Sequence, residues 1–292
     1  MTGVIVKMVE MMDDFPVSER KVAQYISEHL DGMVGLSIKE LSALSGSSEA
    51  AIVRFCKTLG CKGYRDFSIQ LATALAVSQG TPDKDAYGDI HEGDDTESIV
   101  RSVSFHNIQA LEDTYSLIDP KQVSKAAEAL FGANRIDFYG IGASNFVAQD
   151  AQYKFMRINK PATAYSDPHM QLISASNLTD SDAAVAISWS GETKEVLDAA
   201  KRAKENGAFL IAITRCGKTT LGECADVSFE LSAPEVIIRC GAMSSRIAQL
   251  TMIDILFSCI FSRHYHEVRY YLDRTRRRSG KKGNADEKSE KN

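Results

Sequence analysis

Residues 183–193 of this 292-residue chain read Ala-Ala-Val-Ala-Ile-Ser-Trp-Ser-Gly-Glu-Thr. The first part is an apolar run with the length of a buried strand, and residues 194–206 behind it have the pattern of an amphipathic helix. Small side chains, hydroxyls and backbone N–H groups therefore meet at the start of a helix, which is the arrangement that a phosphate monoester requires. The stretch predicts an anion-binding loop at the carboxyl end of a strand.

The region around this stretch alternates short apolar runs with amphipathic segments. Such alternation predicts a parallel sheet covered by helices on both faces, with ligands bound beyond the carboxyl ends of the strands. The expected strands are 136–139, 162–165, 183–188, 209–214 and 227–231, and the clearest helices are 145–158 and 194–206.

A second strand end has the same chemistry as the first. Gly140-Ile141-Gly142-Ala143-Ser144 runs from the first expected strand into a helix. Turn chemistry alone would explain a single hydroxyl at such a position. Hydroxyls at four positions make that explanation weaker and favour a ligand site: Ser144, Ser188, Ser190 and Thr193.

Two other phosphate-binding motifs are weaker interpretations of this region. A dinucleotide fingerprint would start at Gly140 and Gly142, but its third glycine position is Asn145. Residues 212–219 have P-loop spacing except for Ala212 in place of the first glycine, and no partner Asp for magnesium is evident. The six cysteines include no C-x-x-C pair, so we expect reduced thiols, no metal site and no cofactor.

The first 77 residues predict an all-helical domain. Ser18 is expected to cap a first helix, and Ser37 and Glu40 match a capping box that opens a second. Gly46 then permits a tight turn before a third helix over residues 48–59, and a fourth helix follows. Two short helices joined by a glycine turn fit a helix-turn-helix, whose second helix enters the major groove of DNA.

Charge on the third helix supports DNA binding. The segment between Glu49 and Asp66 holds four basic side chains and no acid. Arg54 is positioned for a bidentate contact to guanine, and hydroxyls at the helix N-terminus for contacts to phosphate. The candidate DNA contacts are Ser47, Ser48, Glu49, Ala50, Arg54, Lys57, Lys62 and Tyr64. On periodicity alone, a protein-interaction domain with a solvated basic face is an equal alternative.

Composition and charge divide the chain into four segments. The net charge is −5, with 44% hydrophobic and 25% charged residues, which excludes a collagen, a disulfide scaffold and an acidic disordered chain. The best apolar run is too short for a membrane span and the N-terminus is no secretory signal, so we expect a cytoplasmic protein with no membrane partner. The expected segments are a helix-turn-helix domain at 1–77, an acidic flexible linker at 78–98, an α/β domain with leading helices at 99–273 and a basic disordered tail at 274–292.

These motifs resemble a known family. Ser-x-Ser-Gly-Glu-Thr at 188–193, with Gly142 and Ser144 in the other loop, is similar to the sugar isomerase (SIS) domain, which binds phosphorylated sugars. Together with Ile-Val-Arg-Phe-Cys-Lys-x-Leu-Gly at 52–60 and Lys-Gly-Tyr at 62–64, it resembles the RpiR/MurR-type transcriptional regulators. The resemblance covers residues 15–265. It implies a helical helix-turn-helix bundle followed by a three-layer, flavodoxin-like α/β domain.

The same resemblance implies where an effector binds. The hydroxyls of the two loops would hold its phosphate, and Met-Ser-Ser-Arg at 243–246 would open the last helix near the ligand. His169 follows a candidate strand and is placed to touch a sugar hydroxyl, or it is a surface or capping histidine. The candidate effector contacts are Gly142, Ser144, His169, Ser188, Ser190, Gly191, Thr193, Ser244 and Ser245.

The resemblance implies a regulator, not an enzyme, whose affinity for operator DNA is controlled by a sugar phosphate. It would bind paired half-sites as a homodimer or homotetramer. The alternative is an aldose–ketose isomerase with an accessory helical domain, which needs a general base near the substrate carbon. Glu192, His169 and Glu235 are the candidate bases, but no acid/base pair with a defensible spacing is evident.

Overall fold

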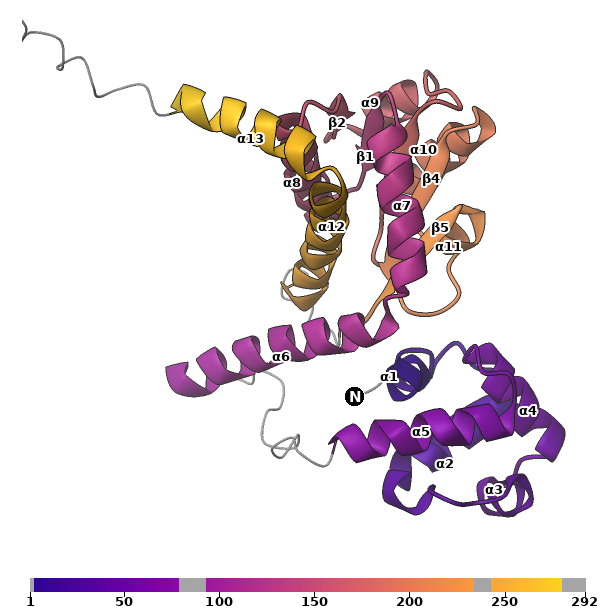
Figure 1. Ribbon diagram of the computed structural model, residues 1–292. Coiled ribbons are helices and arrows are strands. Elements are labelled where there is room, and N and C mark those ends of the chain that lie inside the picture. Colours follow the sequence, from indigo (N-terminus) through magenta and orange to yellow (C-terminus); the bar gives the residue numbers. More distant parts are fainter. Residues whose placement is uncertain (1–2, 79–92, 234–242, 280–292) are drawn as a thin grey trace, which may run out of the picture.

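The computed structural model describes residues 3–78, 93–233 and 243–279, and it divides into a helical and an α/β part (Figure 1). The helical part contains α1 (Gly3–Glu10), α2 (Val17–Glu28), the 3-10 helix η1 (Leu30–Gly32), α3 (Ile38–Ser45), α4 (Glu49–Thr58) and α5 (Tyr64–Ser78). The long helix α6 (Thr96–Leu117) lies between the two parts. The α/β part contains α7 (Pro120–Gly132), β1 (Ile136–Tyr139), α8 (Ala143–Arg157), β2 (Ala162–Thr163), α9 (Pro168–Ala175), β3 (Ala183–Ile187), α10 (Lys194–Glu205), β4 (Phe209–Arg215), α11 (Thr220–Cys224), β5 (Val227–Leu231), α12 (Met243–Arg263) and α13 (Tyr265–Ser279).

The sheet has five parallel strands in the order β2-β1-β3-β4-β5. Side chains alternate along each strand, so one face packs on α7, α8 and α12 and the other on α9, α10 and α11. Both faces are buried, which is why the strands read as nearly continuous apolar runs. The expected three-layer α/β architecture is confirmed, and β2 is shorter than predicted.

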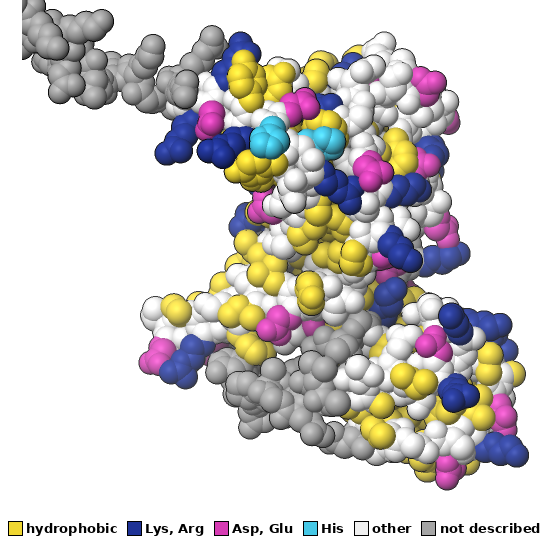
Figure 2. Space-filling model, viewed as in Figure 1, with side chains coloured by type: hydrophobic (Ala, Val, Ile, Leu, Met, Phe, Trp, Pro, Cys, Tyr) yellow, Lys and Arg dark blue, Asp and Glu magenta, His cyan; other side chains and the backbone are white. Residues whose placement is uncertain are grey.

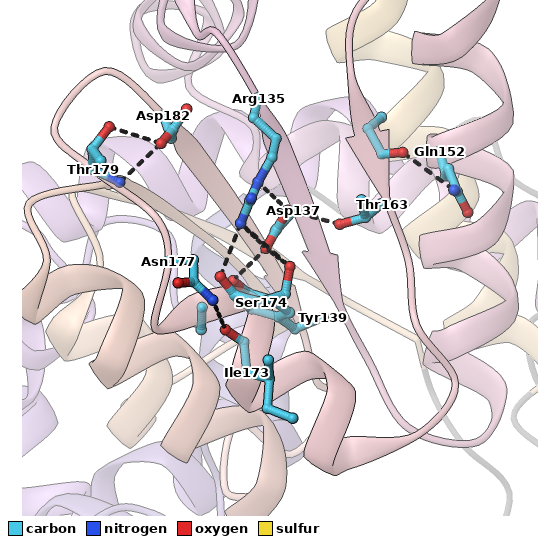
Figure 3. A network of polar contacts seen from close by, with 12 residues as sticks. Arg135, Asp137, Tyr139, Gln152, Thr163, Ile173, Ser174, Asn177, Thr179 and Asp182 are labelled. Carbon is cyan, nitrogen blue, oxygen red and sulfur yellow. Dashed lines mark hydrogen bonds and ion pairs between the residues drawn. The ribbon is translucent and has the colours of Figure 1, made fainter.

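A buried carboxylate fixes the middle of β1 (Figure 3). Asp137 is fully buried and accepts hydrogen bonds from Thr163 Oγ1 at 2.7 Å, Ser174 Oγ at 2.6 Å and the Tyr139 hydroxyl at 3.1 Å. Arg135 Nε lies 3.1 Å from Asp137 Oδ1. Burial raises the pKa of the Tyr139 hydroxyl, which therefore stays protonated and donates. The network ties β1 to β2 and α9 just before the first predicted ligand loop begins.

The helical part confirms the capping box and corrects one cap. Ser37 Oγ accepts from the Glu40 N–H at 3.3 Å, and Glu40 Oε2 accepts from the Ser37 N–H at 2.7 Å. The expected cap at Ser18 is wrong. α2 begins earlier, at Val17, and its N-cap is Pro16, whose carbonyl accepts from the Glu19 and Arg20 N–H groups.

Two expected segment boundaries differ in the structure. α6 begins inside the expected linker 78–98, because Asp95 caps it by accepting from the Ser98 N–H at 2.8 Å. The expected disordered tail at 274–292 begins as helix, since α13 continues to Ser279. Val268 is buried against the core and anchors α13, and the arginines that follow are good helix formers. Residues 79–92 and 280–292 lie outside the described residues.

α12 is long and apolar enough to cross a bilayer, and it is the one such helix in the described part of the chain. Its apolar window is longer than the apolar run at 252–261, which is too short for a membrane span. In this fold it is a core helix, because Ala248, Met252 and Leu256 are buried in the cluster that α7 and α8 also build. Asp254, which interrupts the run, pairs with Lys154 of α8 at 2.7 Å. The apolar residues of α12 therefore form part of the hydrophobic core of the α/β part.

Candidate effector site and DNA interface

The strand order places the two predicted ligand loops side by side. β1 pairs with β2 on one side and with β3 on the other, and residue 139 lies opposite residue 186. The chain therefore reverses its direction of winding between β1 and β3, and such a switch point is where open parallel sheets bind ligands. The loop at 140–144 follows β1 and the loop at 188–193 follows β3. We call these two loops the cradle.

The β3 side of the cradle is a web of small hydroxyl contacts. Ser188 Oγ and Thr193 Oγ1 lie 2.9 Å apart, and Ser188 Oγ also accepts from the Gly191 N–H at 3.2 Å. Ser190 Oγ accepts from the Glu192 N–H at 3.2 Å. Thr193 is the N-cap residue of α10 but its side chain makes no capping bond. The predicted hydroxyls are thus brought together at the first turn of a helix.

The β3 loop requires glycine at position 191. Gly191 has a φ of 69°, and a Cβ there would lie 2.5 Å from Thr219 Cβ. Both the left-handed backbone and the close approach of Thr219 exclude larger residues. The glycine therefore allows the β4–α11 loop to pack directly against the cradle.

On the β1 side, buried amides hold the loop in place. Asn145 Nδ2 donates to the Gly140 and Tyr165 carbonyls at 3.2 and 3.0 Å, and Gln171 Nε2 donates to the same two carbonyls at 2.9 and 2.7 Å. Ser144 is buried in the first turn of α8. In the sequence Asn145 stands out only as the residue in place of a third glycine, and Gln171 does not stand out. A polar residue at a buried helical position would have been the signal for both.

The remaining predicted effector residues lie on other elements. Gly142 is the N-cap residue of α8. Ser244 and Ser245 are buried in the first turn of α12, a helix that packs against α8. His169 is an exposed residue in the first turn of α9.

The candidate general bases do not form an acid/base pair in the described residues. Glu192 is exposed, and its Oε1 accepts from the Thr220 N–H at 2.8 Å. That hydrogen bond holds the pKa of Glu192 below its usual value, whereas a general base near neutral pH needs a raised one. Glu235 lies outside the described residues.

Residues 212–219 do not form a P-loop. Residues 212–215 are part of β4, and Thr219 Oγ1 accepts from the Gly222 N–H at 3.1 Å as the cap of the short helix α11. Lys218 is exposed and pairs with Glu223 at 2.7 Å. Half of the motif is therefore strand, and its lysine is engaged on the surface.

In the helical part, α3 and α4 are joined by the expected tight turn. Gly46 ends α3 with a φ of 63°, a left-handed conformation that glycine adopts without strain. Ser48 caps α4 by accepting from the Ala51 N–H at 3.3 Å. Ile52 and Phe55 are buried, so the opposite side of α4 faces solvent.

The exposed side chains on α4 include Glu49, Ala50, Arg54 and Lys57, and Lys62 is exposed just beyond it. Figure 2 shows Lys and Arg side chains on the part of the helical domain where α4 lies.

Arg54 is held by a residue that the sequence did not single out. The buried carboxylate of Glu19 lies 3.7 Å from Arg54 Nε and accepts from Thr58 Oγ1 at 3.0 Å. The Arg54 side chain nevertheless stays 58% exposed. Glu19 on α2 therefore orients the guanidinium on the solvent face of α4.

Two residues predicted to contact DNA form hydrogen bonds within the protein instead. Ser47 is buried and donates to the Ser18 carbonyl at 3.2 Å. The Tyr64 hydroxyl donates to the Leu36 carbonyl at 2.8 Å, and burial raises its pKa. Both side chains brace the turns around α3 and α4, so their hydroxyls are not free to meet DNA in this structure.

The helical and α/β parts are joined by specific contacts. Arg215 Nη1 donates to Asp14 Oδ2 at 2.9 Å, and Ser232 Oγ donates to Glu10 Oε1 at 2.7 Å. The side chain of Cys216, from the β4–α11 loop, is buried in the apolar core of the helical part. The two parts therefore pack on each other through the loop that follows β4 and through the residue that follows β5.

Comparisons with known proteins assign both parts of the chain. Residues 2–78 match the rpiR-family helix-turn-helix domain and residues 129–259 match the SIS domain. The HTH-type transcriptional regulator TTE0211 of Caldanaerobacter subterraneus is 44% identical over 275 residues, covering 94% of this chain and 96% of that protein. The HTH-type transcriptional regulator HexR of Pseudomonas aeruginosa is 32% identical over 274 residues, covering 94% of each.

A solved structure with a similar fold includes a ligand. The Vibrio vulnificus NanR protein complexed with ManNAc-6P is 29% identical, with a TM-score of 0.59 over 94% of this chain and 97% of that one. The full-length match carries the same order of helical and α/β parts. The chain belongs to the rpiR family of helix-turn-helix transcriptional regulators that carry a SIS domain.

Proposed function

We propose that this regulator reads operator DNA with α4 and that a sugar phosphate bound in the cradle controls its affinity for the operator. The observation that carries the proposal is the hydroxyl cluster at the ends of β1 and β3, in a chain that also exposes a basic helix-turn-helix face. The similarity to NanR, solved with ManNAc-6P, supports the class of ligand.

The hydroxyls of Ser144, Ser188, Ser190 and Thr193 would donate to the phosphate, and Gly142 and Gly191 would let it approach the backbone. Ser188 Oγ and Thr193 Oγ1 lie 2.9 Å apart, and rotation about its C–O bond would let either hydroxyl donate to an anion instead. Ser244, Ser245 and His169 are proposed to complete the site around the sugar.

On the DNA side, Arg54 is proposed to read a guanine, and Lys57 and Lys62 to contact phosphates. Glu49, Ala50 and Ser48 lie at the N-terminal end of α4, which enters the groove first in this class of domain. Ser47 and Tyr64 act in this proposal as braces for the recognition helix.

Control requires a route from the cradle to the helical part, and the β4–α11 loop supplies one. The Arg215 N–H donates to the Trp189 carbonyl at 2.8 Å, while the Arg215 side chain bonds Asp14 of the helical part. The Leu221 N–H donates to the Gly191 carbonyl at 3.1 Å. A shift of the β3 loop on ligand binding would therefore move the contact between Arg215 and Asp14 that joins the two parts.

The chain is proposed to be a sensor without catalytic turnover, and its close relatives are named as transcriptional regulators. The lowered pKa of Glu192 favours this role over general-base catalysis. Turnover of a phosphosugar by the purified protein, lost in Glu192→Gln, would instead establish the isomerase.

The proposal is tested by operator binding in the presence and absence of a panel of sugar phosphates. The double variant Ser188→Ala, Ser190→Ala should bind operator like the wild type and lose the effector response, because only the cradle is changed. Ser176→Ala is the matched control, since its hydroxyl donates to the Leu172 carbonyl at the exposed end of α9. An undiminished response in the double variant would refute the assigned site.

The DNA contact is tested separately with Arg54→Ala. We expect a loss of about 1–3 kcal/mol in operator binding and a relaxed base preference at one position. Lys57→Ala should instead weaken binding to all sequences and reduce the salt dependence. Operator binding that is unchanged in Arg54→Ala would remove the recognition-helix assignment.

A further inference from the structure

α12 carries a buried polar side chain whose donor has no partner. Gln249 is 1% exposed, and its Oε1 lies 3.5 Å from the Ser144 hydroxyl. Its Nε2 has no hydrogen-bond partner in the part of the chain that the structure describes. A buried amide without a partner for its N–H groups is destabilising, so such a group calls for an explanation.

The position of Gln249 points to the cradle. Its contact, Ser144, is the hydroxyl that the β1 loop contributes. Ser245 lies one helical turn before Gln249 and is also buried, so both are on the same face of α12. α12 packs against α8, the helix that starts at the cradle. The free amide therefore lies next to the place where the phosphate is proposed to bind.

Gln171 provides a contrast on the other side of the loop. It is equally buried, but its Nε2 donates to the Gly140 carbonyl at 2.9 Å and to the Tyr165 carbonyl at 2.7 Å. The N–H groups of Gln171 are consumed by the backbone, and that residue shapes the loop. Those of Gln249 are not, so Gln249 is available to a ligand.

We propose that Gln249 is a ligand-contact residue whose Nε2 donates to an oxygen of the phosphate, beside Ser144. This inference rests on the proposed function, because it assumes that the cradle holds a phosphate. It adds a neutral donor on α12 to hydroxyls that come from the β1 and β3 loops. The phosphate would thereby be held by three segments of the chain.

The test is Gln249→Leu, compared with the wild type by thermal shift and by titration calorimetry. Without ligand the variant should melt close to the wild-type temperature, because the substitution removes the unpartnered Nε2 while the Ser144 hydroxyl loses only a long contact of 3.5 Å. With a sugar phosphate its affinity should fall about tenfold or more. Inorganic phosphate, used as the second probe, should lose affinity in parallel.

Thr251→Val is the matched control on the same helix. The Thr251 hydroxyl donates to the Ile247 carbonyl of α12 itself at 2.9 Å, so its loss should leave ligand affinity unchanged. Wild-type affinity in Gln249→Leu would overturn the proposal. Weaker binding of the sugar phosphate with unchanged binding of inorganic phosphate would overturn the assignment to the phosphate group.

Gln249→Glu keeps the test decisive if the leucine variant does not fold. The carboxyl retains the size of the amide but becomes an anion as the pH rises. Its affinity for the sugar phosphate should therefore lie well below the wild-type value at pH 9, where the phosphate is dianionic and an ionised carboxylate repels it. Wild-type affinity in Gln249→Glu at that pH would contradict the contact. Failure of the proposed function itself would differ, since the wild type would then bind no sugar phosphate at all.

Discussion

The four contacts of Asp137 make it the clearest single-residue determinant of the α/β part. Asp137→Asn removes the charge that Arg135 pairs with and places an amide donor among hydroxyls that donate. Arg135 keeps some access to water, so we expect a loss of about 3 kcal/mol in the free energy of unfolding, measured by urea denaturation at pH 7. Thr163→Val removes one neutral donor from the same carboxylate and should cost less. Equal stability of Asp137→Asn and the wild type would contradict this role.

At the same scale, the sequence predicted the hydroxyls of the site but not the residues that position them. Ser188, Ser190 and Thr193 belong to a local motif, and a local motif can be read without the fold. Glu19 acts on Arg54 from another helix, and Gln249 meets Ser144 across the gap between α12 and α8. Such pairs are separated by tens of residues, so they become visible only when the elements are packed. The same limit explains why the sequence predicts a DNA contact at Ser47. Its hydrogen bond to Ser18 of α2 buries it, and no local pattern in the sequence predicts that bond.

At the scale of elements, the strands were predicted more closely than the helices. Buried parallel strands leave short apolar runs with polar ends, and all five expected strands are found. α1 was missed, although Val4, Ile5 and Met8 are buried against the rest of the helical part, because an eight-residue helix leaves little periodicity to read. The end of α13 contradicts the expected disordered tail beyond residue 273, a prediction that rests on a segment that is almost wholly charged. Packing of Val268 fixes the start of α13, and the helix propensity of the following arginines extends it although its last turns have no buried face.

α8 exposes several large apolar side chains among the residues that the structure describes. Phe146, Tyr153 and Met156 are 63, 62 and 57% exposed and follow one another along the helix at spacings of seven and three residues. Phe146 follows the cradle directly, so a second copy seated on α8 would adjoin the effector. If the homodimer or homotetramer expected from the sequence uses this face, it should dissociate in Phe146→Ser, Tyr153→Ser, as measured by analytical ultracentrifugation. Val17→Ser, at an exposed apolar residue of the helical part, is the control. A dimer that survives the double substitution would place the interface elsewhere.

At the scale of the whole molecule, regulation needs two sites that change one shared contact. α6, the β4–α11 loop and the end of β5, where Ser232 bonds Glu10, join the helical and the α/β part. Of these, the loop also touches the cradle, through the packing of Thr219 on Gly191 and the bond from Thr220 to Glu192. Effectors in coupled systems typically change affinity by about 5–150-fold. That change should depend on the loop and much less on charges on the outer surface of the α/β part.

Asp14→Asn and Arg215→Ala test this dependence by breaking the ion pair at 2.9 Å between the two parts. Each variant should still bind sugar phosphate in calorimetry, because the cradle hydroxyls are unchanged. The ratio of operator affinities with and without effector should move toward one, and the double variant should change it little more than either single variant, since one contact is removed in all three.

Cys216 gives an independent readout, because burial raises the pKa of its thiol and shields it in the helical core. Its alkylation, followed by peptide mass spectrometry, should be faster in both variants. Arg202→Ala breaks only a surface pair with Glu205 and should change neither quantity. A wild-type effector ratio in Arg215→Ala would mean that the signal leaves the cradle by another route.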